Sequence, residues 1–433
     1  MTDTSPLYVG IDFGTSGCRL IGITADGRVA LQASQPLPPP DSDGAGVEQP
    51  AGLWWEALSA LLSELPAAQR GRIAAIAIDG TSGTVLVTDA AGCPQAPALM
   101  YNDGRAQAEA ARIAPLVPAA SGAHGPTSSL AKLLWLCAQR PCTPDGHALH
   151  QADWLANRLA GRLGISDENN ALKLGYDPMA RRWPDWLAAT GLDTRLLPEV
   201  LPPGTPIGPL DPVVAHRLGL PAQARVVTGT TDSIAAFLAT GADRIGDAAS
   251  SLGSTLALKV LSDTPVFDRD TGVYSHRLWD RWLAGGASNS GGAVLEHFFT
   301  RQRLDELTPL MDPGQPTGLD YYPLVRPGER FPVSDPTLAP RLEPRPAEDH
   351  RFLQGLLEGI ARIEERGYRR LEALGAPWPG RVFSVGGGAA NPVFTRIRAG
   401  LLACEMARPV HTEAAYGAAL LARRGSLANP EED

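Results

Sequence analysis

The sequence predicts an α/β fold built from two unequal repeats. Apolar strand-like runs alternate with segments of helical spacing, and a strand–turn–strand unit at residues 8–24 recurs in similar form at 247–260. The length of 433 residues exceeds what one ordinary core accommodates, so two domains are expected. We place them at residues 1–228 and 229–433.

The individual elements follow from apolar periodicity and from the Gly and Pro residues that end each run. Strands are expected over 8–12, 19–24, 72–78, 84–88, 225–228 and 382–384, and a strand–turn–strand over 247–260. Helices are expected over 53–65, 129–140, 150–159, 233–240, 350–374 and 414–423. The Pro-rich segments 35–46, 201–212 and 305–347 are expected to be loops or irregular.

Composition excludes several classes of protein. The net charge of −9 leaves no basic excess for general nucleic-acid binding. No apolar run approaches the roughly 20 residues that span a bilayer, and the N-terminal residues lack a signal-peptide pattern, so a cytoplasmic protein without a membrane partner is expected. The five cysteines form no Cys-x-x-Cys pair, so reduced thiols are expected rather than a disulfide framework or zinc site. None of the three lysines lies in a P-loop, and Lys132 and Lys173 are expected at the surface.

Small-residue turns follow four strand ends, at residues 14–17, 80–84, 253–255 and 386–389. One such turn usually has only a structural role, but two in matched hairpins favour phosphate binding by backbone N–H and hydroxyl groups. Four aspartates also follow apolar runs, at the sheet edge where ligands bind in α/β proteins: Asp12, Asp79, Asp103 and Asp232. Structural roles stay open for Asp79 as a turn cap and for Asp232 as a helix N-cap.

Taken in order, these motifs resemble the FGGY family of carbohydrate kinases, within the actin/hexokinase/Hsp70 ATPase superfamily. The resemblance rests on GIDFGTSGCRL (10–20), YNDGRA (101–106), GTTDSIAAFLATGA (229–242), SSLGSTLALKV (250–260) and SVGGGAANPVFTRIRAGLLACEMARP (384–409). It implies two actin-like, ribonuclease-H-like ATPase domains with a cleft between them. ATP and Mg²⁺ are the implied nucleotide and metal, with a small sugar as the other substrate.

The resemblance also implies roles for individual residues. Asp232 is expected to be the catalytic base, and Asp12 a second catalytic carboxylate that holds Mg²⁺ through water. The residues expected along ATP are Gly14, Thr15, Ser16, Gly17, Gly253, Ser254 and Thr255 at the phosphates, and Gly387, Gly388 and Asn391 at the adenosine. The sugar is expected to contact Asp12, Ser82, Asp103 and Asp232.

Within the family, the DGTSGT motif (79–84) and the short chain most resemble the compact D-ribulose kinases. The expected reaction is phosphorylation of the terminal hydroxyl of D-ribulose to D-ribulose 5-phosphate. A D-xylulose or other polyol kinase is the alternative, although D-xylulose kinases carry Met-His-Gly where this chain has Thr81-Ser82-Gly83. An actin-like ATPase and a non-catalytic sugar sensor are alternatives of other classes. Retention of both Asp12 and Asp232 disfavours the sensor, and a monomer and a homodimer both stay open.

Overall fold

The structure is a computed structural model that describes residues 4–140, 142–143 and 145–427. These residues divide into two compact units: unit 1 comprises Met1–Ala239 with Glu413–Asp433, and unit 2 comprises Thr240–Thr412. The division differs from the boundary expected at 228/229. Helix α8 (Asp232–Ala239) and the last helix, α13 (Ala414–Leu427), pack against each other, so both belong with unit 1.

The main sheet of unit 1 has the order β12-β13-β6-β1-β2-β3, with β14 also paired to β6. Its strands are β1 (Leu7–Phe13), β2 (Gly17–Ile23), β3 (Val29–Pro36), β6 (Ile73–Gly80), β12 (Pro206–Pro209), β13 (Arg225–Val227) and β14 (Thr230–Thr231). The strands β1, β6 and β14 run parallel, in a register that pairs Asp12 with Asp79 and Asp79 with Thr230. Parallel strands end at the same sheet edge, so their C-terminal residues lie together.

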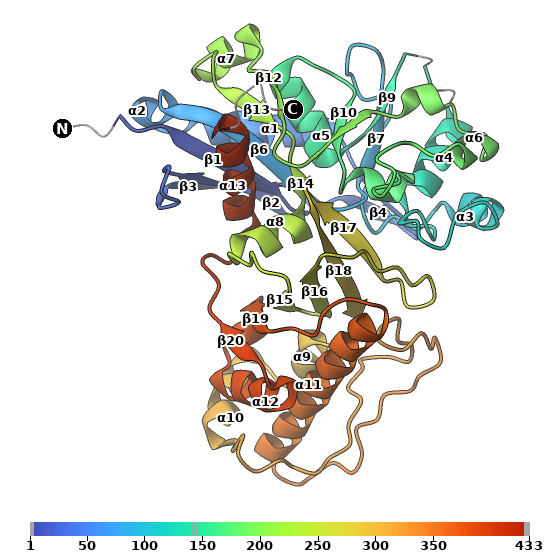
Figure 1. Cartoon of the computed structure of the whole chain (residues 1–433), viewed down its shortest axis with the longest axis vertical. Coiled ribbons are helices and arrows are strands. Elements are labelled where there is room, and N and C mark those ends of the chain that lie inside the picture. The colour runs from blue at the N-terminus through green and yellow to red at the C-terminus, as the bar shows by residue number, and fades with distance from the viewer. Residues whose placement is uncertain (1–3, 141, 144, 428–433) are drawn as a thin grey trace. The chain divides into compact units, whose positions relative to one another are not determined.

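Helix α13 covers β1 at very close range, as Figure 1 shows for the red helix beside the sheet of unit 1. Gly10 makes this approach possible: a Cβ atom there would lie 2.0 Å from the carbonyl oxygen of Ala415 and 2.1 Å from the nitrogen of Ala419. No side chain fits such a gap, so the sequence uses glycine in the middle of a buried strand. The helix therefore packs tightly against β1, the strand that carries Asp12 near its C-terminal end.

Unit 1 has a second sheet, in the order β4-β5-β8-β7-β9. It consists of β4 (Asp41–Asp43), β5 (Gly46–Gln49), β7 (Val85–Thr88), β8 (Ala98–Leu99) and β9 (His147–His150), while β10 (Ile165–Asp167) pairs with β11 (Glu199–Leu201). The remaining helices are α1 (Ala51–Ser63), α2 (Ala67–Arg70), α3 (Gln107–Ile113), α4 (Ser129–Gln139), α5 (Gln151–Ala160), α6 (Trp186–Ala189) and α7 (Pro212–Leu218). Short 3₁₀ helices span Ala171–Leu174 and Thr194–Leu196.

One pair of cysteines departs from the expectation of reduced thiols. Cys137, on α4, and Cys142 form a disulfide, with their Cα atoms 5.3 Å apart. A Cys-x-x-Cys search misses it because the two residues are five positions apart, across the end of a helix. The separation of their Cα atoms lies within the ordinary range for a disulfide.

Unit 2 has one sheet, in the order β17-β18-β16-β15-β19-β20. Its strands are β15 (Asp247–Leu252), β16 (Leu256–Ser262), β17 (Tyr274–Leu278), β18 (Arg281–Ser288), β19 (Arg381–Val385) and β20 (Glu405–Ala407). Its helices are α9 (Gly292–Phe298), α10 (Arg301–Leu307), α11 (Asp349–Ala373) and α12 (Pro392–Leu402), with 3₁₀ turns at Thr308–Leu310 and Gly387–Ala390. The long helix α11 buries one face and packs against α12, as Figure 1 shows.

A buried ion pair joins the two helices to the sheet of unit 2. Arg398 of α12 donates from Nε to Glu364 Oε2 at 2.6 Å and from Nη2 to Glu364 Oε1 at 2.7 Å, and both residues are fully buried. The same groups reach the strands, because Arg398 Nη1 donates to Ser384 Oγ and Ser250 Oγ donates to Glu364 Oε1. The network thus holds the strands β15 and β19 just before the turns at Gly253 and Gly387.

Most expected elements form within a few residues of their predicted ends. The segments expected as loops are only partly so: 35–46 contains β4 and leads into β5, and 201–212 contains β12. These strands have only three or four residues each, too few to show an apolar periodicity, so the sequence does not reveal them. Among the residues that the structure describes, no helix is both long and apolar enough to cross a bilayer.

The buried ion pair generates a stability prediction. Arg398→Met leaves the Glu364 carboxylate buried without its cation, and we expect it to lower the free energy of unfolding by about 3 to 5 kcal/mol. Arg303→Met is the control, because Arg303 pairs with Glu306 and Asp349 at the surface, and it should cost about 1 kcal/mol or less. Denaturant unfolding measures both. Equal, small losses in the two variants would contradict the role of the network.

Candidate active site

Three carboxyl groups meet at the C-terminal edge of β1, β6 and β14. Asp12 and Asp79 are paired neighbours on parallel strands, and Asp232 begins α8 directly after β14. The charges of Asp12 and Asp232 both raise the pKa of Asp79, as expected for groups at one sheet edge. The sequence placed each acid at a strand end, and the register brings these three together.

Asp79 lies deepest of the three. Its side chain is fully buried, its Oδ1 and Oδ2 accept no hydrogen bond from an N–H or hydroxyl group of the described residues, and it shares a side-chain hydrogen bond with Asp12. Burial, and then the neighbouring carboxyls of Asp12 and Asp232, raise its pKa well above the ordinary 3.8. We therefore treat Asp79 as the group that keeps a proton. The turn-cap role left open for it is not seen, since its oxygens accept no backbone N–H of the described residues.

Asp12 is half-buried beside Asp79. Burial raises its pKa, while the interaction with Asp79 and the charge of Arg19 lower it. Arg19 is the cross-strand partner of Asp12 on β2, and its guanidinium lies 3.3 Å from Glu413 at the start of α13. Asp79 and the Arg19 cation favour the ionised form of Asp12, but burial outweighs them and the pKa of Asp12 is raised above its ordinary value.

Asp232 lies at the first turn of α8, where the positive end of the helix dipole favours a carboxylate. The backbone N–H of Ser233 donates to Asp232 Oδ1 at 2.6 Å. The side chain is partly exposed, unlike that of Asp79. The Asp232 carboxyl is therefore accessible to a ligand, and its position at the start of α8 favours its anionic form.

The turn after β1 is closed by a hydrogen bond from the N–H of Gly14 to the carbonyl of Gly17 at 3.0 Å. Thr15 and Ser16 occupy its tip, with Ser16 exposed. In unit 2 the corresponding turn between β15 and β16 exposes Ser254 and Thr255. Both turns therefore present hydroxyl groups next to short backbone, as phosphate binding requires.

The turn after β6, residues 81–84, is held from several sides. Thr84 N–H donates to the carbonyl of Thr81, and Gly83 has φ +94°, a conformation that favours glycine. Gln151 Oε1 accepts from both N and Oγ1 of Thr81. Ser82 stays half-buried at the tip of this rigid turn.

Asp103 is fully buried and supports its own loop. Its carboxylate accepts hydrogen bonds from the N–H of Val47, at 2.7 Å, and from N and Nε of Arg105, at 3.1 and 2.9 Å. The neighbouring Tyr101 and Asn102 are exposed. These contacts give Asp103 a structural role, and a contact of Asp103 with a sugar stays a prediction.

Lys132 and Lys173 do not lie where the sequence predicted. Lys132 is fully buried and Lys173 is half-buried, and both side chains turn toward the 81–84 turn. The sequence predicted a surface position for Lys132 because no motif indicates its hydrogen-bond acceptors. They are two backbone carbonyls that are distant from it in sequence.

Unit 2 contains a cavity of about 430 Å³ that brings together residues predicted along ATP. Its lining includes Gly253 and Ser254 from the first turn and Gly387, Gly388 and Asn391 from the second. A Cβ atom at Gly387 would meet nothing within 4 Å, so this backbone faces open space. Apolar walls come from Leu252, Leu295, Leu304, Leu353, Leu357 and Phe394.

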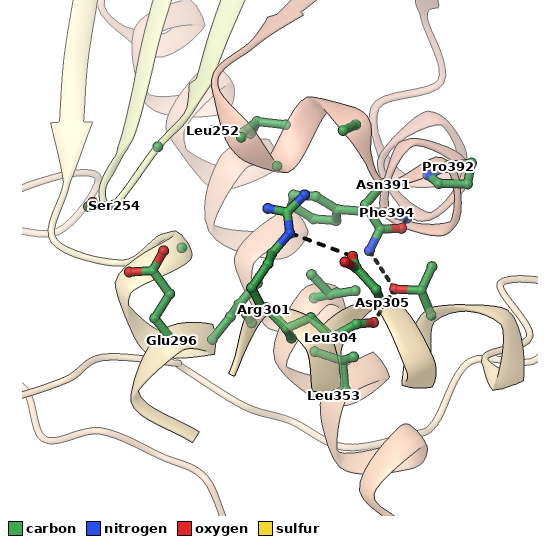
Figure 2. A pocket seen from close by; sticks show the side chains of 18 residues that line it. Leu252, Ser254, Glu296, Arg301, Leu304, Asp305, Leu353, Asn391, Pro392 and Phe394 are labelled. Carbon is green, nitrogen blue, oxygen red and sulfur yellow. Dashed lines mark hydrogen bonds and ion pairs between the residues drawn. The ribbon is translucent and has the colours of Figure 1, made fainter. Parts of the chain in front are cut away.

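Figure 2 shows Arg301, Asp305 and Asn391 near one another in this cavity, with Glu296 apart from Asp305 and Asn391. Arg301 Nε lies 3.6 Å from Asp305 Oδ1. Asn391 caps α12 by accepting from the N–H groups of Val393 and Phe394, and its Nδ2 donates to Thr308 Oγ1 at 3.3 Å. The cavity thus offers apolar walls and a few fixed polar groups, the usual chemistry of a pocket for an aromatic base.

The chain matches known proteins over nearly its whole length. Residues 7–239 match the N-terminal domain of the FGGY family of carbohydrate kinases, and residues 248–426 match its C-terminal domain. The chain belongs to the FGGY family. Members are phosphotransferases with an alcohol group as acceptor, and they use ATP.

Individual relatives agree with this assignment. The xylulose kinase of Escherichia coli is 25% identical over 449 residues, covering 98% of this chain and 91% of that protein. The xylulose kinase of Streptomyces coelicolor is 31% identical over 262 residues, 58% of this chain and 53% of its own length. A structure from Brucella ovis, described as a "xyloylose kinase", has a TM-score of 0.88 at 26% identity, covering 98% of this chain and 91% of its own. The FGGY fold, with its two actin-like ATPase domains, is thereby confirmed.

The buried acid of this site generates a pH prediction. Because the folded state holds the proton of Asp79 more tightly than the unfolded chain, the free energy of unfolding should fall as pH rises above about 4. Asp79→Asn mimics the protonated acid and removes this dependence. We expect its stability relative to wild type to increase by up to about 1.4 kcal/mol per pH unit. Thermal unfolding from about pH 5 to about pH 8 measures it, and a constant difference would contradict the buried proton.

Proposed function

We propose that the protein transfers the γ-phosphoryl group of ATP to the terminal hydroxyl of a ketopentose, and that D-ribulose is its substrate, giving D-ribulose 5-phosphate. The observation that carries the proposal is the group of carboxyls at one sheet edge, with Asp232 accessible and Asp79 buried. A phosphoryl transfer to an alcohol needs a positioned acceptor for the hydroxyl proton, and Asp232 meets that need.

Asp232 acts as the base in this proposal. It accepts the proton of the sugar hydroxyl as the oxygen attacks the γ-phosphorus and the bond from that phosphorus to the bridging oxygen of ADP breaks. In a loose transition state the proton leaves late, so an ordinary carboxylate is basic enough. In this proposal Asp79 keeps its proton and so adds no third negative charge to those of Asp12 and Asp232.

The turns that contain Gly14, Thr15, Ser16 and Gly17, and Gly253, Ser254 and Thr255, are proposed to bind the phosphates of ATP. Gly387, Gly388 and Asn391 are proposed to line its adenosine, and the apolar walls of the unit 2 cavity support this placement. Backbone N–H groups and hydroxyls of these turns orient the nucleotide without a P-loop lysine.

Mg²⁺ is the proposed metal, held by Asp12 through water. No group of three or more potential ligands is present among the described His, Cys, Asp and Glu residues. The site fits the usual mode of Mg²⁺, which takes one or two carboxylates together with water and substrate phosphate oxygens. The ion supplies charge neutralisation at the phosphates.

For the sugar, Ser82 offers a hydroxyl on a rigid turn, and Asp103 Oδ1, which accepts one of the hydrogen bonds described above, keeps a lone pair for a sugar hydroxyl. Asp12 and Asp232 are the other proposed contacts. The Thr81-Ser82-Gly83 sequence, in place of Met-His-Gly, favours D-ribulose. The names of the relatives favour D-xylulose equally, so D-xylulose is the second candidate.

A substrate panel decides between these sugars. ADP release is measured with MgATP and each of D-ribulose, D-xylulose, L-ribulose, glycerol and gluconate. The proposal predicts the largest kcat/KM with D-ribulose. A larger value with D-xylulose supports the second candidate, and no stimulation by any of the five would contradict the proposed function.

The role of Asp232 generates a first prediction about catalysis. Asp232→Ala and the isosteric Asp232→Asn should lower kcat for the sugar by about 10²- to 10⁴-fold, because the proton acceptor is lost. The Kd for ATP should stay within about twofold, since no ATP contact is removed. Asp193→Asn, which removes another carboxylate of unit 1 from an ion pair with Arg195, is the control. Wild-type turnover in Asp232→Asn would contradict the assignment.

Asp12 generates the second. Asp12→Asn should lower kcat about a hundredfold at low Mg²⁺, and part of the loss should be recovered as Mg²⁺ is raised. Its melting temperature should stay close to that of the wild type. Steady-state rates over a Mg²⁺ titration, with thermal unfolding of the same samples, test this. A variant with full activity at every Mg²⁺ concentration would leave Asp12 as a structural turn residue.

A further inference from the structure

Lys132 is a buried cation outside the roles described so far. It lies on α4, is fully buried, and donates from Nζ to the carbonyl oxygens of Gly83, at 2.6 Å, and Met100, at 2.8 Å. A lysine is almost never fully buried without partners, so these two hydrogen bonds explain how the position is tolerated. Each acceptor belongs to a different loop.

The first loop is the 81–84 turn that carries Ser82. Besides Lys132, its Gly83 carbonyl accepts from Ser129 Oγ at 3.4 Å, and its Ser82 carbonyl accepts from Lys173 Nζ at 3.0 Å. Every one of these bonds is made to main-chain oxygen, so the Ser82 hydroxyl is not used by them. These bonds hold the main chain of the turn in place and leave the Ser82 hydroxyl available to a ligand.

The second loop is 100–103. Its Met100 carbonyl accepts both from Lys132 and from the N–H of Asp103, at 3.0 Å. The exposed Tyr101 and Asn102 lie between these two residues. One ammonium group therefore joins the turn of Ser82 to the loop of Asp103, the two segments proposed above to contact the sugar.

We propose that Lys132 is a positioning residue for the acceptor sugar: its ammonium group holds the 81–84 turn and the 100–103 loop at a fixed separation, so that both segments contact one sugar molecule. This inference rests on the proposed function, because it takes these segments as the sugar site. Lys132 itself touches neither the sugar nor the phosphates.

The charges around Lys132 make the effect depend on pH. Burial and then the charge of Lys173 lower the pKa of Lys132 to about 7, while Asp103, itself paired with Arg105, acts in the opposite direction. His150 reaches the same Gly83 carbonyl only through Ser129 Oγ. An ammonium donates stronger hydrogen bonds than a neutral amine, so the two loops are held less firmly as pH rises above about 7.

The test separates KM from kcat. Lys132→Met should raise KM for the pentulose about tenfold or more, because two charge-assisted hydrogen bonds are lost. The KM for ATP and kcat should stay within about twofold. In wild type, KM for the pentulose should rise as pH passes about 7, and this rise should be absent from Lys132→Met.

Leu134→Ala is the matched control, because it removes a buried side chain from the same helix that, being apolar, can make no hydrogen bond to either loop. It should lower the melting temperature and leave KM for the pentulose unchanged. The inference is overturned if Lys132→Met raises this KM no more than Leu134→Ala does, or if it changes both KM values and kcat together. Absence of pentulose turnover in the wild type would instead contradict the proposed function.

If Lys132→Met does not fold, the wild-type protein still gives the answer. The chain has three lysines, so ¹⁵N-lysine labelling gives three side-chain signals, which Lys173→Met and Lys259→Met assign by elimination. Saturating D-ribulose or D-xylulose should shift the Lys132 signal, and ATP alone should not. An unchanged Lys132 signal with a bound pentulose overturns the inference.

Discussion

The parallel pairing of β1, β6 and β14 is the constraint on which the candidate site depends. Its register sets Asp12 beside Asp79 and ends β14 immediately before Asp232. Burial, together with the neighbouring carboxyls of Asp12 and Asp232, raises the pKa of Asp79 well above its ordinary value, so Asp79 is the group of the three that we propose to be protonated. Asp12 and Asp232 are then left in different surroundings, and so can serve different roles, one near a metal and one as a base.

The two units supply different kinds of chemical group. Unit 1 supplies the carboxyls and the loops joined by Lys132, all of them hydrogen-bonding groups suited to a polyol. Unit 2 supplies a cavity with apolar walls and glycine turns, suited to a nucleotide. In each unit, buried charged groups support the turns. Lys132 donates to the turn that contains Ser82, and the Glu364–Arg398 pair bonds to the strands that lead into the turns at Gly253 and Gly387. Rigid turns on such support keep reacting groups in place without large rearrangement.

The sequence predicted the parts of the site that lie at the ends of apolar runs. Asp12, Asp232 and the glycine turns could be found because strand periodicity and small residues are local signals. Lys132 could not, since its hydrogen-bond acceptors are distant in the chain, and the strands β4, β5 and β12 could not, since they are too short to show a periodicity. The sequence also left the role of Asp79 open, because its burial and its pairing with Asp12 depend on the register of the sheet. Local patterns therefore predicted which carboxyl groups and turns lie at strand ends. The shift in the pKa of Asp79 depends on tertiary contacts that those patterns do not contain.

We propose that Asp79 is protonated at neutral pH while Asp232 is a carboxylate. Infrared difference spectra at neutral pH test this directly, because a protonated carboxyl has a carbonyl band distinct from that of a carboxylate. Subtracting the Asp79→Asn spectrum from that of the wild type should leave a protonated-carboxyl band, and Asp232→Asn should remove only carboxylate bands. Loss of the protonated band in Asp232→Asn, or its absence from the wild type, would show that the proton is not on Asp79.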